Sequence, residues 1–305
     1  MKRVFFLFLD GVGFGDDDTS INPLCAGDYP TLLRLTGGVA LTRSTGRITT
    51  ADADVLPLDA CMGVEGRPQS ATGQASLLTG RNVPAAIGEH YGPRPDDRVR
   101  KLVLGANLFS AVQKAGLGAC FCNAYPPGFF DAVDRGKRLL SVIQFAAQSS
   151  GLRLMGKDDL QAGTAISVGY TNRSWRDQLG YREIPVYSPH EAGMQFWRMA
   201  QASSFVLHDH WMTDVLGHHE DLPGAVADLQ TFDGFLGGLL SAADLEETLI
   251  IIASDHGNVE DCSHGKHTLN PALGMLIGNR EGLPVVETAH LYDVARLVKR
   301  FLEIE

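Results

Sequence analysis

The sequence predicts an α/β protein built around one central sheet whose strands run mostly parallel. The first observation is that stretches with the apolar composition of buried strands alternate along the chain with stretches of helical periodicity. The second is that several apolar runs end at, or shortly before, an aspartate or a histidine. In open α/β sheets, the residues that follow parallel strands gather at the carboxyl edge, so these polar residues are expected to form one cluster.

The predicted strands are short apolar runs, and the predicted helices show apolar stripes bounded by glycine, proline or small polar residues. The last helix, for example, places an apolar stripe of five residues on one face. In chain order, the predicted elements are a strand at 4–9, a helix beginning at 31–35, helices at 70–79 and 107–115, a strand at 119–123, a helix at 137–149, a strand at 164–168, a helix at 190–202, a strand at 204–207, a helix at 222–240, strands at 249–253 and 273–277, and a helix at 291–302.

The size and charge of the chain limit the classes of protein to which it can belong. Its 305 residues are enough for one large core with an insertion, and 44% hydrophobic with 20% charged residues is typical of a globular protein. A net charge of −10 with scattered basic residues argues against a nucleic-acid or membrane partner. The apolar N-terminus ends at Asp10 without a small-residue cleavage site, so we interpret it as a strand and expect a cytoplasmic protein.

Residues typical of metal centres lie in five short motifs. They are Asp10 in FLDGVG, Ser70 in QSATGQ, Asp214 and His218 in TDVLGHH, Asp255 and His256 in SDHGN, and His267 in KHTLNP. Three carboxylates, three imidazoles and one hydroxyl are the groups that two adjacent divalent cations and a nucleophile require. Asp214 and His218 are four residues apart, which places both on one face of a helix, where they can hold one ion.

The order of these five motifs resembles the alkaline phosphatase superfamily, and within it the branch of cofactor-independent phosphoglycerate mutase and phosphopentomutase. The resemblance implies an alkaline-phosphatase-like three-layer sandwich with a central, mostly parallel sheet. It extends from residue 1 to the C-terminal helix, except for the segment 125–190, which matches nothing in that pattern. We therefore expect a discontinuous α/β core at 1–124 and 191–305, with 125–190 as a small insertion or cap.

The resemblance also implies two metal sites. The first would consist of Asp214, His218 and His267, and the second of Asp10, Asp255, His256 and Ser70. The mixed Asp and His ligands predict two divalent ions, zinc or manganese. The mutases carry a hydroxyl residue three positions before a Gly-His pair, and this pattern selects Ser70 as the nucleophile, with Thr72 as the alternative. The chain departs from the mutases at Gln74, where they have histidine.

Four further residues are candidates for binding phosphate oxygens because of their place in the sequence. Arg67 and Arg81 flank the nucleophile motif, and Asn258 and Lys266 lie near the proposed ligands. A hydroxyl bound to a divalent cation loses its proton near neutral pH, and a helix N-terminus favours the resulting phosphoryl group.

These features predict a two-metal enzyme that transfers a phosphoryl group from a small-molecule phosphate ester through a covalent phosphoserine. A phosphatase or phosphodiesterase is favoured over a cofactor-independent phosphomutase, because the unmatched segment 125–190 is much shorter than the inserted domain of the mutases. A metal-binding regulatory protein without turnover is the alternative from another class. The chain has no Cys-x-Pro-x-Arg motif, which argues against a type I sulfatase. The sequence does not predict the oligomeric state.

Overall fold

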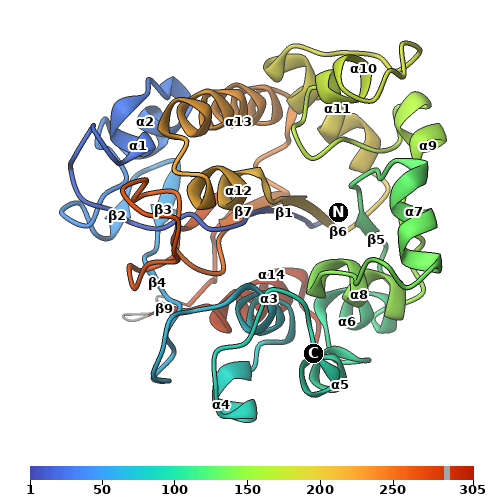
Figure 1. Ribbon diagram of the computed structural model, residues 1–305, viewed down its shortest axis with the longest axis horizontal. Coiled ribbons are helices and arrows are strands. Elements are labelled where there is room, and N and C mark those ends of the chain that lie inside the picture. Colours follow the sequence, from blue (N-terminus) through green and yellow to red (C-terminus); the bar gives the residue numbers. More distant parts are fainter. Residues whose placement is uncertain (285–288) are drawn as a thin grey trace.

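The computed structural model describes residues 1–284 and 289–305, and its centre is a mixed, largely parallel sheet (Figure 1). The strand order is β2-β3-β8-β7-β1-β6-β5, and the four strands from β7 to β5 run parallel. The strands are β1 (Arg3–Leu9), β2 (Ile48–Thr49), β3 (Ala53–Val55), β5 (Ala119–Phe121), β6 (Phe205–His210), β7 (Thr248–Ala253) and β8 (Gly274–Gly278). A separate parallel pair joins β4 (Leu58–Asp59) to β9 (Ala289–His290). The predicted α/β class is confirmed.

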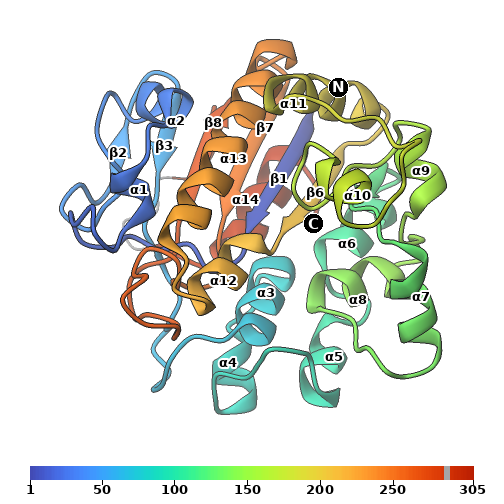
Figure 2. The same ribbon diagram turned by 45° about the horizontal axis from the view of Figure 1, so that its top comes forward.

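Helices cover both faces of this sheet, which gives three layers (Figures 1 and 2). One face carries α1 (Pro23–Ala26), α2 (Pro30–Leu35), α11 (Pro189–Ala200), α12 (Met212–His218) and α13 (Leu222–Ala242). The other face carries α3 (Ser70–Thr79), α4 (Val83–Ile87), α5 (Asp97–Val103), α6 (Leu108–Lys114), α8 (Val142–Ser149) and α14 (Asp293–Leu302). Beyond the β5 edge lie α7 (Pro127–Asp134) and α9 (Lys157–Gln161), and α10 (Arg173–Asp177) lies on the side of the sheet that carries α11.

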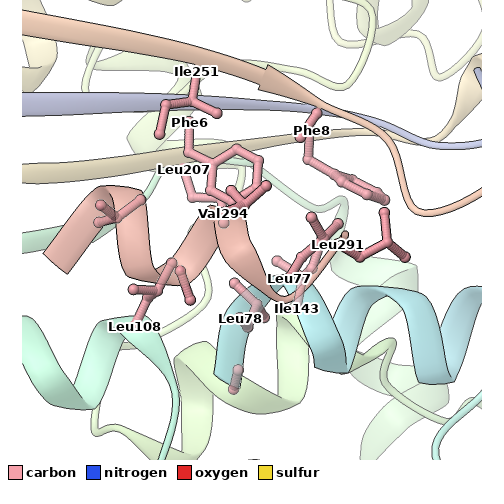
Figure 3. Close-up of a cluster of buried hydrophobic side chains, with 14 of the residues drawn as sticks. Phe6, Phe8, Leu77, Leu78, Leu108, Ile143, Leu207, Ile251, Leu291 and Val294 are labelled. Atoms are coloured by element: carbon pink, nitrogen blue, oxygen red, sulfur yellow. The ribbon is translucent and has the colours of Figure 1, made fainter. Parts of the chain in front are cut away.

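The central strands are buried on both faces, which is why they are continuous apolar runs in the sequence. Side chains alternate between the faces, so Phe6 and Phe8 of β1 point toward α3 and α14 (Figure 3), whereas Phe5 and Leu7 belong to the cluster beneath α11 and α13. The alternation matters most in β6, where it sends neighbouring polar residues to opposite faces of the sheet.

Most predicted elements are present, and the differences have local causes. The helix predicted at 137–149 begins only at Val142, because Ser141 and Gln144 form a capping box that fixes its first turn. The strand predicted at 164–168 is reduced to a single bridge between Ile166 and Asn123. Helix α7 was not predicted, although Pro127 at its first turn is a common start signal.

The segment 125–190 packs on the rest of the chain and also forms a small cluster of its own. Helix α8 packs on α3, and Ile143 joins the large cluster between the sheet and α14 (Figure 3). A small separate cluster forms around Trp175 and Leu160 at the outer end. The division into a core and a cap therefore stays a prediction. In the part of the chain that is described, no helix combines the length and the apolar character needed to cross a membrane.

The packing of α11 against α13 leads to a test of the fold. A Cβ atom on Gly193 would collide with the backbone of α13 at Phe235, whereas a Cβ on Gly128 in α7 would meet open space. We expect Gly193→Ala to lower the free energy of unfolding by about 1–3 kcal/mol, because an overpacked interface must shift. Gly128→Ala should leave stability unchanged or raise it by about 0.5–1 kcal/mol. Urea denaturation measures both, and equal effects would contradict the close helix contact.

Candidate metal centre

Three carboxylates meet at the carboxyl edge of the sheet because their strands are neighbours. Asp10 directly follows β1, Asp255 follows the adjacent β7, and Asp214 lies in the first turn of α12, which follows β6 on the other side of β1. The hydroxyl of Thr213 donates to the Asp10 carbonyl at 2.5 Å, which ties α12 to the end of β1. Segments more than 200 residues apart are thus held within hydrogen-bond distance of one another.

His256 lies at the centre of one half of the cluster. Its Nε2 atom is 3.5 Å from Asp10 Oδ1, 3.6 Å from Asp255 Oδ2 and 3.1 Å from the Oγ atom of Ser70. All four side chains are buried. No hydrogen bond reaches Asp10 Oδ1 from any described residue. An unpartnered carboxylate oxygen in a buried cluster of oxygen and nitrogen donors is the situation that a cation would complete.

The other half of the cluster is centred on Asp214. Its Oδ1 atom is 3.6 Å from His267 Nε2, and its Oδ2 atom is 3.3 Å from His218 Nε2. The second ring nitrogen of each histidine faces a backbone carbonyl: His218 Nδ1 lies 2.9 Å from Gly265 O and His267 Nδ1 lies 2.8 Å from Pro68 O. When Nδ1 carries the proton that these contacts require, Nε2 is left free as a ligand.

All seven predicted ligands are therefore brought together, although the two halves are not sharply separated. The rings of His256 and His267 stack with centroids 3.7 Å apart. Candidate ligand atoms lie within 4.8 Å of one another in two groups, namely Asp10, Asp255 and His256, and Asp214, His256 and His267. His256 thus stands at the boundary, within reach of either cation position.

The accumulation of negative charge changes the pKa values of the cluster. Burial and the charges of Asp255 and Asp214 raise the pKa of Asp10 well above its ordinary value. Burial and the Asp214 charge raise the pKa of Asp255 to about 7. The hydrogen bond to Asp214 raises the pKa of His218 to about 9, and burial lowers the pKa of His267 to about 4. Burial and mutual repulsion disfavour the ionised forms of Asp10 and Asp255, and two divalent cations would relieve that repulsion.

A buried carboxylate that the sequence analysis missed holds the loops around the centre. Glu260 accepts hydrogen bonds from the backbone N–H groups of Gly13 at 3.0 Å and Asn258 at 2.7 Å, and from the side chains of Thr268 and Asn270. It thereby joins the loops that follow β1 and β7 to the loop that carries His267. In the sequence, Glu260 is marked only by its place at the end of the DHGNVE stretch. That place does not tell whether its carboxylate binds a metal or holds the surrounding loops.

The four predicted phosphate-binding residues are placed otherwise than the sequence suggested. Arg67 donates to the His267 carbonyl. Arg81 follows the C-terminal end of α3, about 15 Å along the helix from Ser70. Asn258 donates to Asp214 Oδ1 at 2.8 Å and so orients a ligand. Lys266 is exposed. None of the four lines the cavity that opens beside Ser70.

That cavity has a volume of about 220 Å³, and two other arginines contribute to it. Arg94 comes from the loop before α5, and Arg138 comes from the 125–190 segment, where its guanidinium lies 5.0 Å above the Phe129 ring. Partial burial and the charge of Arg94 lower the pKa of Arg138. The remaining lining residues are Asp10, Ser70, Gln74, Pro93, Ser141, Gln144, Asp209, Trp211, Asp214 and Val215.

The two candidate nucleophiles occupy different environments. Ser70 is the first residue of α3, and its hydroxyl is directed at His256. The Thr72 hydroxyl instead donates to the Gln69 carbonyl at 3.1 Å and accepts from the backbone N–H of Tyr91 at 3.2 Å. Gln74 places its amide nitrogen 3.4 Å from both Asp10 Oδ2 and Asp255 Oδ2. Of the two hydroxyls, only that of Ser70 borders the cavity.

Fold and ligand cluster together define a class of metalloenzymes, and comparison with known proteins agrees. A sequence profile of the Metalloenzyme superfamily matches residues 192–305. The C-terminal part of the chain is therefore similar to this superfamily.

More specific sequence similarity is restricted to part of the chain. The 2,3-bisphosphoglycerate-independent phosphoglycerate mutase of Dinoroseobacter shibae is 32% identical over 98 residues, which cover 30% of this chain and 19% of that protein. The corresponding enzyme of Desulforudis audaxviator is 26% identical over 117 residues, 36% of this chain and 23% of that protein. The matched region therefore spans only about a fifth of the length of these relatives.

Solved structures resemble the chain over its whole length. Leishmania mexicana phosphoglycerate mutase has a TM-score of 0.58 at 11% identity, with 100% of this chain and 96% of that chain covered. The alkaline phosphatase of the Antarctic bacterium TAB5 has a TM-score of 0.57 at 10% identity, with 99% and 98% covered. At such low identity these similarities concern the fold.

Metal binding should depend on pH. A cation must displace the proton of His218, whose pKa is about 9, and at pH 6 also that of Asp255, whose pKa is about 7. We expect the apparent affinity for Mn²⁺ to rise at least about tenfold between pH 6 and pH 8. In the metal-free protein, the raised pKa of Asp255 contributes to the free energy of unfolding at low pH, and this contribution is lost as the pH rises through 7. The increase in thermal stability on adding Mn²⁺ should therefore become larger over the same pH range. Calorimetric titration and thermal melts at three pH values test this, and an affinity independent of pH would contradict it.

The clamp formed by Glu260 can be tested with an isosteric change. Glu260→Gln replaces one acceptor oxygen by a donor that faces other donors, so we expect a loss of about 1–3 kcal/mol in the free energy of unfolding. The exposed Glu65 provides the control, because Glu65→Gln should stay within about 0.5 kcal/mol of wild type. If urea denaturation gives the same small change for both variants, Glu260 does not hold these loops.

Proposed function

We propose that the protein is a two-metal phosphoryl-transfer enzyme that hydrolyses a small-molecule phosphate ester through a covalent phosphoserine on Ser70. The observation that supports this most is the position of the Ser70 hydroxyl. It lies 3.1 Å from His256 Nε2 inside the carboxylate and imidazole cluster, and it borders the cavity that Arg94 and Arg138 line. A nucleophile, a cation-binding cluster and two anion-binding groups thus meet at one point.

The place of Ser70 at the start of α3 suits the attachment of a phosphoryl group. Helix α3 has ten residues and begins at Ser70. The free N–H groups and the dipole of a helix N-terminus favour negative charge at that position. The guanidinium groups of Arg94 and Arg138 can bind the non-bridging oxygens of the ester. Two divalent cations, which we propose to be zinc or manganese, would lower the pKa of the Ser70 hydroxyl and neutralise the transferring group.

The reaction then has two displacements. In the first, Ser70 Oγ forms a bond to phosphorus while the bond between phosphorus and the alcohol oxygen breaks, and the alcohol leaves after taking up a proton. In the second, a water oxygen forms a bond to phosphorus while the bond to Ser70 Oγ breaks, and Ser70 regains a proton. A monoester thereby releases inorganic phosphate, and a diester releases the remaining monoester. Asn258, which binds Asp214, and Glu260, which joins the loops, keep the ligands in place throughout.

Hydrolysis is favoured over phosphomutase activity because water can reach the cavity. Arg138 is exposed, and α8, the helix of the segment 125–190 that reaches the cavity, has only eight residues. A mutase must hold its dephosphorylated intermediate and exclude water. The second candidate, a cofactor-independent phosphomutase, is supported by the names of the relatives and by the fact that Arg138, Ser141 and Gln144 of this segment do line the cavity.

Mass spectrometry tests the phosphoserine directly. We expect brief incubation with Mn²⁺ or Zn²⁺ and a panel of phosphate mono- and diesters to add one phosphoryl group to the Ser70 peptide. Ser70→Ala should abolish the adduct and lower turnover by at least about a thousandfold. Thr72→Ala is the control, because its hydroxyl is bound to the backbone outside the cavity, and it should keep the adduct.

Three outcomes separate the candidates. Release of inorganic phosphate supports the hydrolase. Conversion of 2-phosphoglycerate to 3-phosphoglycerate without free phosphate would replace it by the mutase. Metal binding without adduct or turnover for any ester would contradict an enzymatic role and leave a metal-binding regulatory protein.

A further inference from the structure

Asp209 is the one carboxylate of the cavity that belongs to neither group of candidate ligands. It lies near the end of β6, opposite Phe8 of β1 in the strand register. Side chains alternate along this strand, so Asp209 points to the same face as Leu207, toward α3 and α8. His208 and His210 point to the opposite face, where both rings lie against Tyr170. The strand therefore aims a single carboxylate at the space beside Ser70.

The backbone of Asp209 is held by hydrogen bonds, whereas one oxygen of its carboxylate has no partner among the described residues. Its backbone N–H donates to Asn123 Oδ1 at 2.8 Å, and its carbonyl accepts from Asn123 Nδ2 at 2.7 Å, so the position of the residue is fixed from both sides. Asp209 is only 3% exposed, and no hydrogen bond from the described residues reaches Oδ1. Leaving a buried carboxylate oxygen unpaired is costly, so a partner from outside the chain is the natural complement.

The surroundings indicate what that partner is. Arg94 and Arg138 supply the positive charge of the cavity and suit the phosphoryl group, whereas the negative charge of Asp209 would repel it. Asp209 therefore faces the other part of the ester, the alcohol, together with the indole of Trp211 and the polar side chains of Ser141 and Gln144. Burial raises the pKa of Asp209 to about 7. Its ionised form can only accept hydrogen bonds, so that form is complemented by a donor.

We propose that Asp209 determines the specificity of this cavity by selecting phosphate esters whose alcohol portion carries a hydrogen-bond donor, either a hydroxyl or an ammonium group. The cavity of about 220 Å³ restricts the alcohol to a small molecule. This inference rests on the proposed phosphoryl-transfer function and concerns its substrate class. Sites built to bind a donor reject analogues that lack it, because the acceptor is then left unpaired.

Two matched pairs of esters test the proposal with the metal-loaded protein. Glycerol 3-phosphate is compared with 1-propyl phosphate, and 2-aminoethyl phosphate is compared with ethyl phosphate. In at least one pair, kcat/KM of the wild type should be at least about tenfold higher for the ester that carries the donor. In Asp209→Ala this ratio should fall to about one.

Asp209→Asn distinguishes the two kinds of donor. The amide keeps an acceptor oxygen but loses the negative charge, so selection for a hydroxyl should largely survive, whereas selection for an ammonium group should be lost. Asp228→Asn is the matched control, because Asp228 is a carboxylate on the opposite face of the sheet, where it pairs with His210 at 2.6 Å. The control should keep the wild-type ratio in both pairs, and the ratio is independent of how much active protein each preparation contains.

The possible failures can be told apart. Turnover by the wild type without preference in either pair would overturn this inference alone. If Asp209→Ala lowers kcat/KM equally for both members of a pair, this inference is also overturned, because such a loss would indicate a role in the fold or the metal cluster. If no ester is hydrolysed or forms a phosphoserine, the proposed function is overturned, and this inference with it.

Discussion

The mutual repulsion of three carboxylates, two of them buried and the third half-buried, is the constraint on which the rest of the site depends. Asp10, Asp214 and Asp255 are brought together by the adjacency of β1, β6 and β7, and burial in a common cluster raises the pKa of two of them. A fold that places like charges together out of water needs compensation, which here can come from bound cations and from the hydrogen bonds of the surrounding loops. The hydrogen bond from the Asn258 side chain to Asp214 is one such contact.

The close approach of α3 to this cluster explains the unusual composition of the helix. Nine of its ten residues are buried, and most of them are small. A Cβ atom on Gly73 would lie 2.8 Å from Asp255 Cβ, so only glycine lets the helix approach the loop after β7 this closely. The approach brings Ser70 to His256 and Gln74 to Asp10, and it points the helix N-terminus at the cavity. Packing of the helix and presentation of the proposed nucleophile are therefore one structural feature.

The sequence predicted the elements and residues that local patterns specify. Apolar runs ending in aspartate indicated β1 and β7, and the spacing of Asp214 and His218 indicated one helix face. Arg94, Asp209 and Glu260 could not be predicted, because their roles arise from contacts between distant segments. The opposite error has the same origin: Arg81 is close to Ser70 in sequence, but the intervening helix carries it to the far end of α3. Proximity along the chain predicts a shared site poorly when a regular element lies between.

The most direct test of a two-ion centre is the metal content of the purified protein after loading with Mn²⁺ or Zn²⁺, determined by native mass spectrometry. The account predicts two ions per chain. It also predicts one ion in Asp214→Asn and one in Asp10→Asn, because each substitution removes a carboxylate from a different half of the cluster. A maximum of one ion in the wild type, or the loss of both ions in each variant, would contradict two separate metal positions.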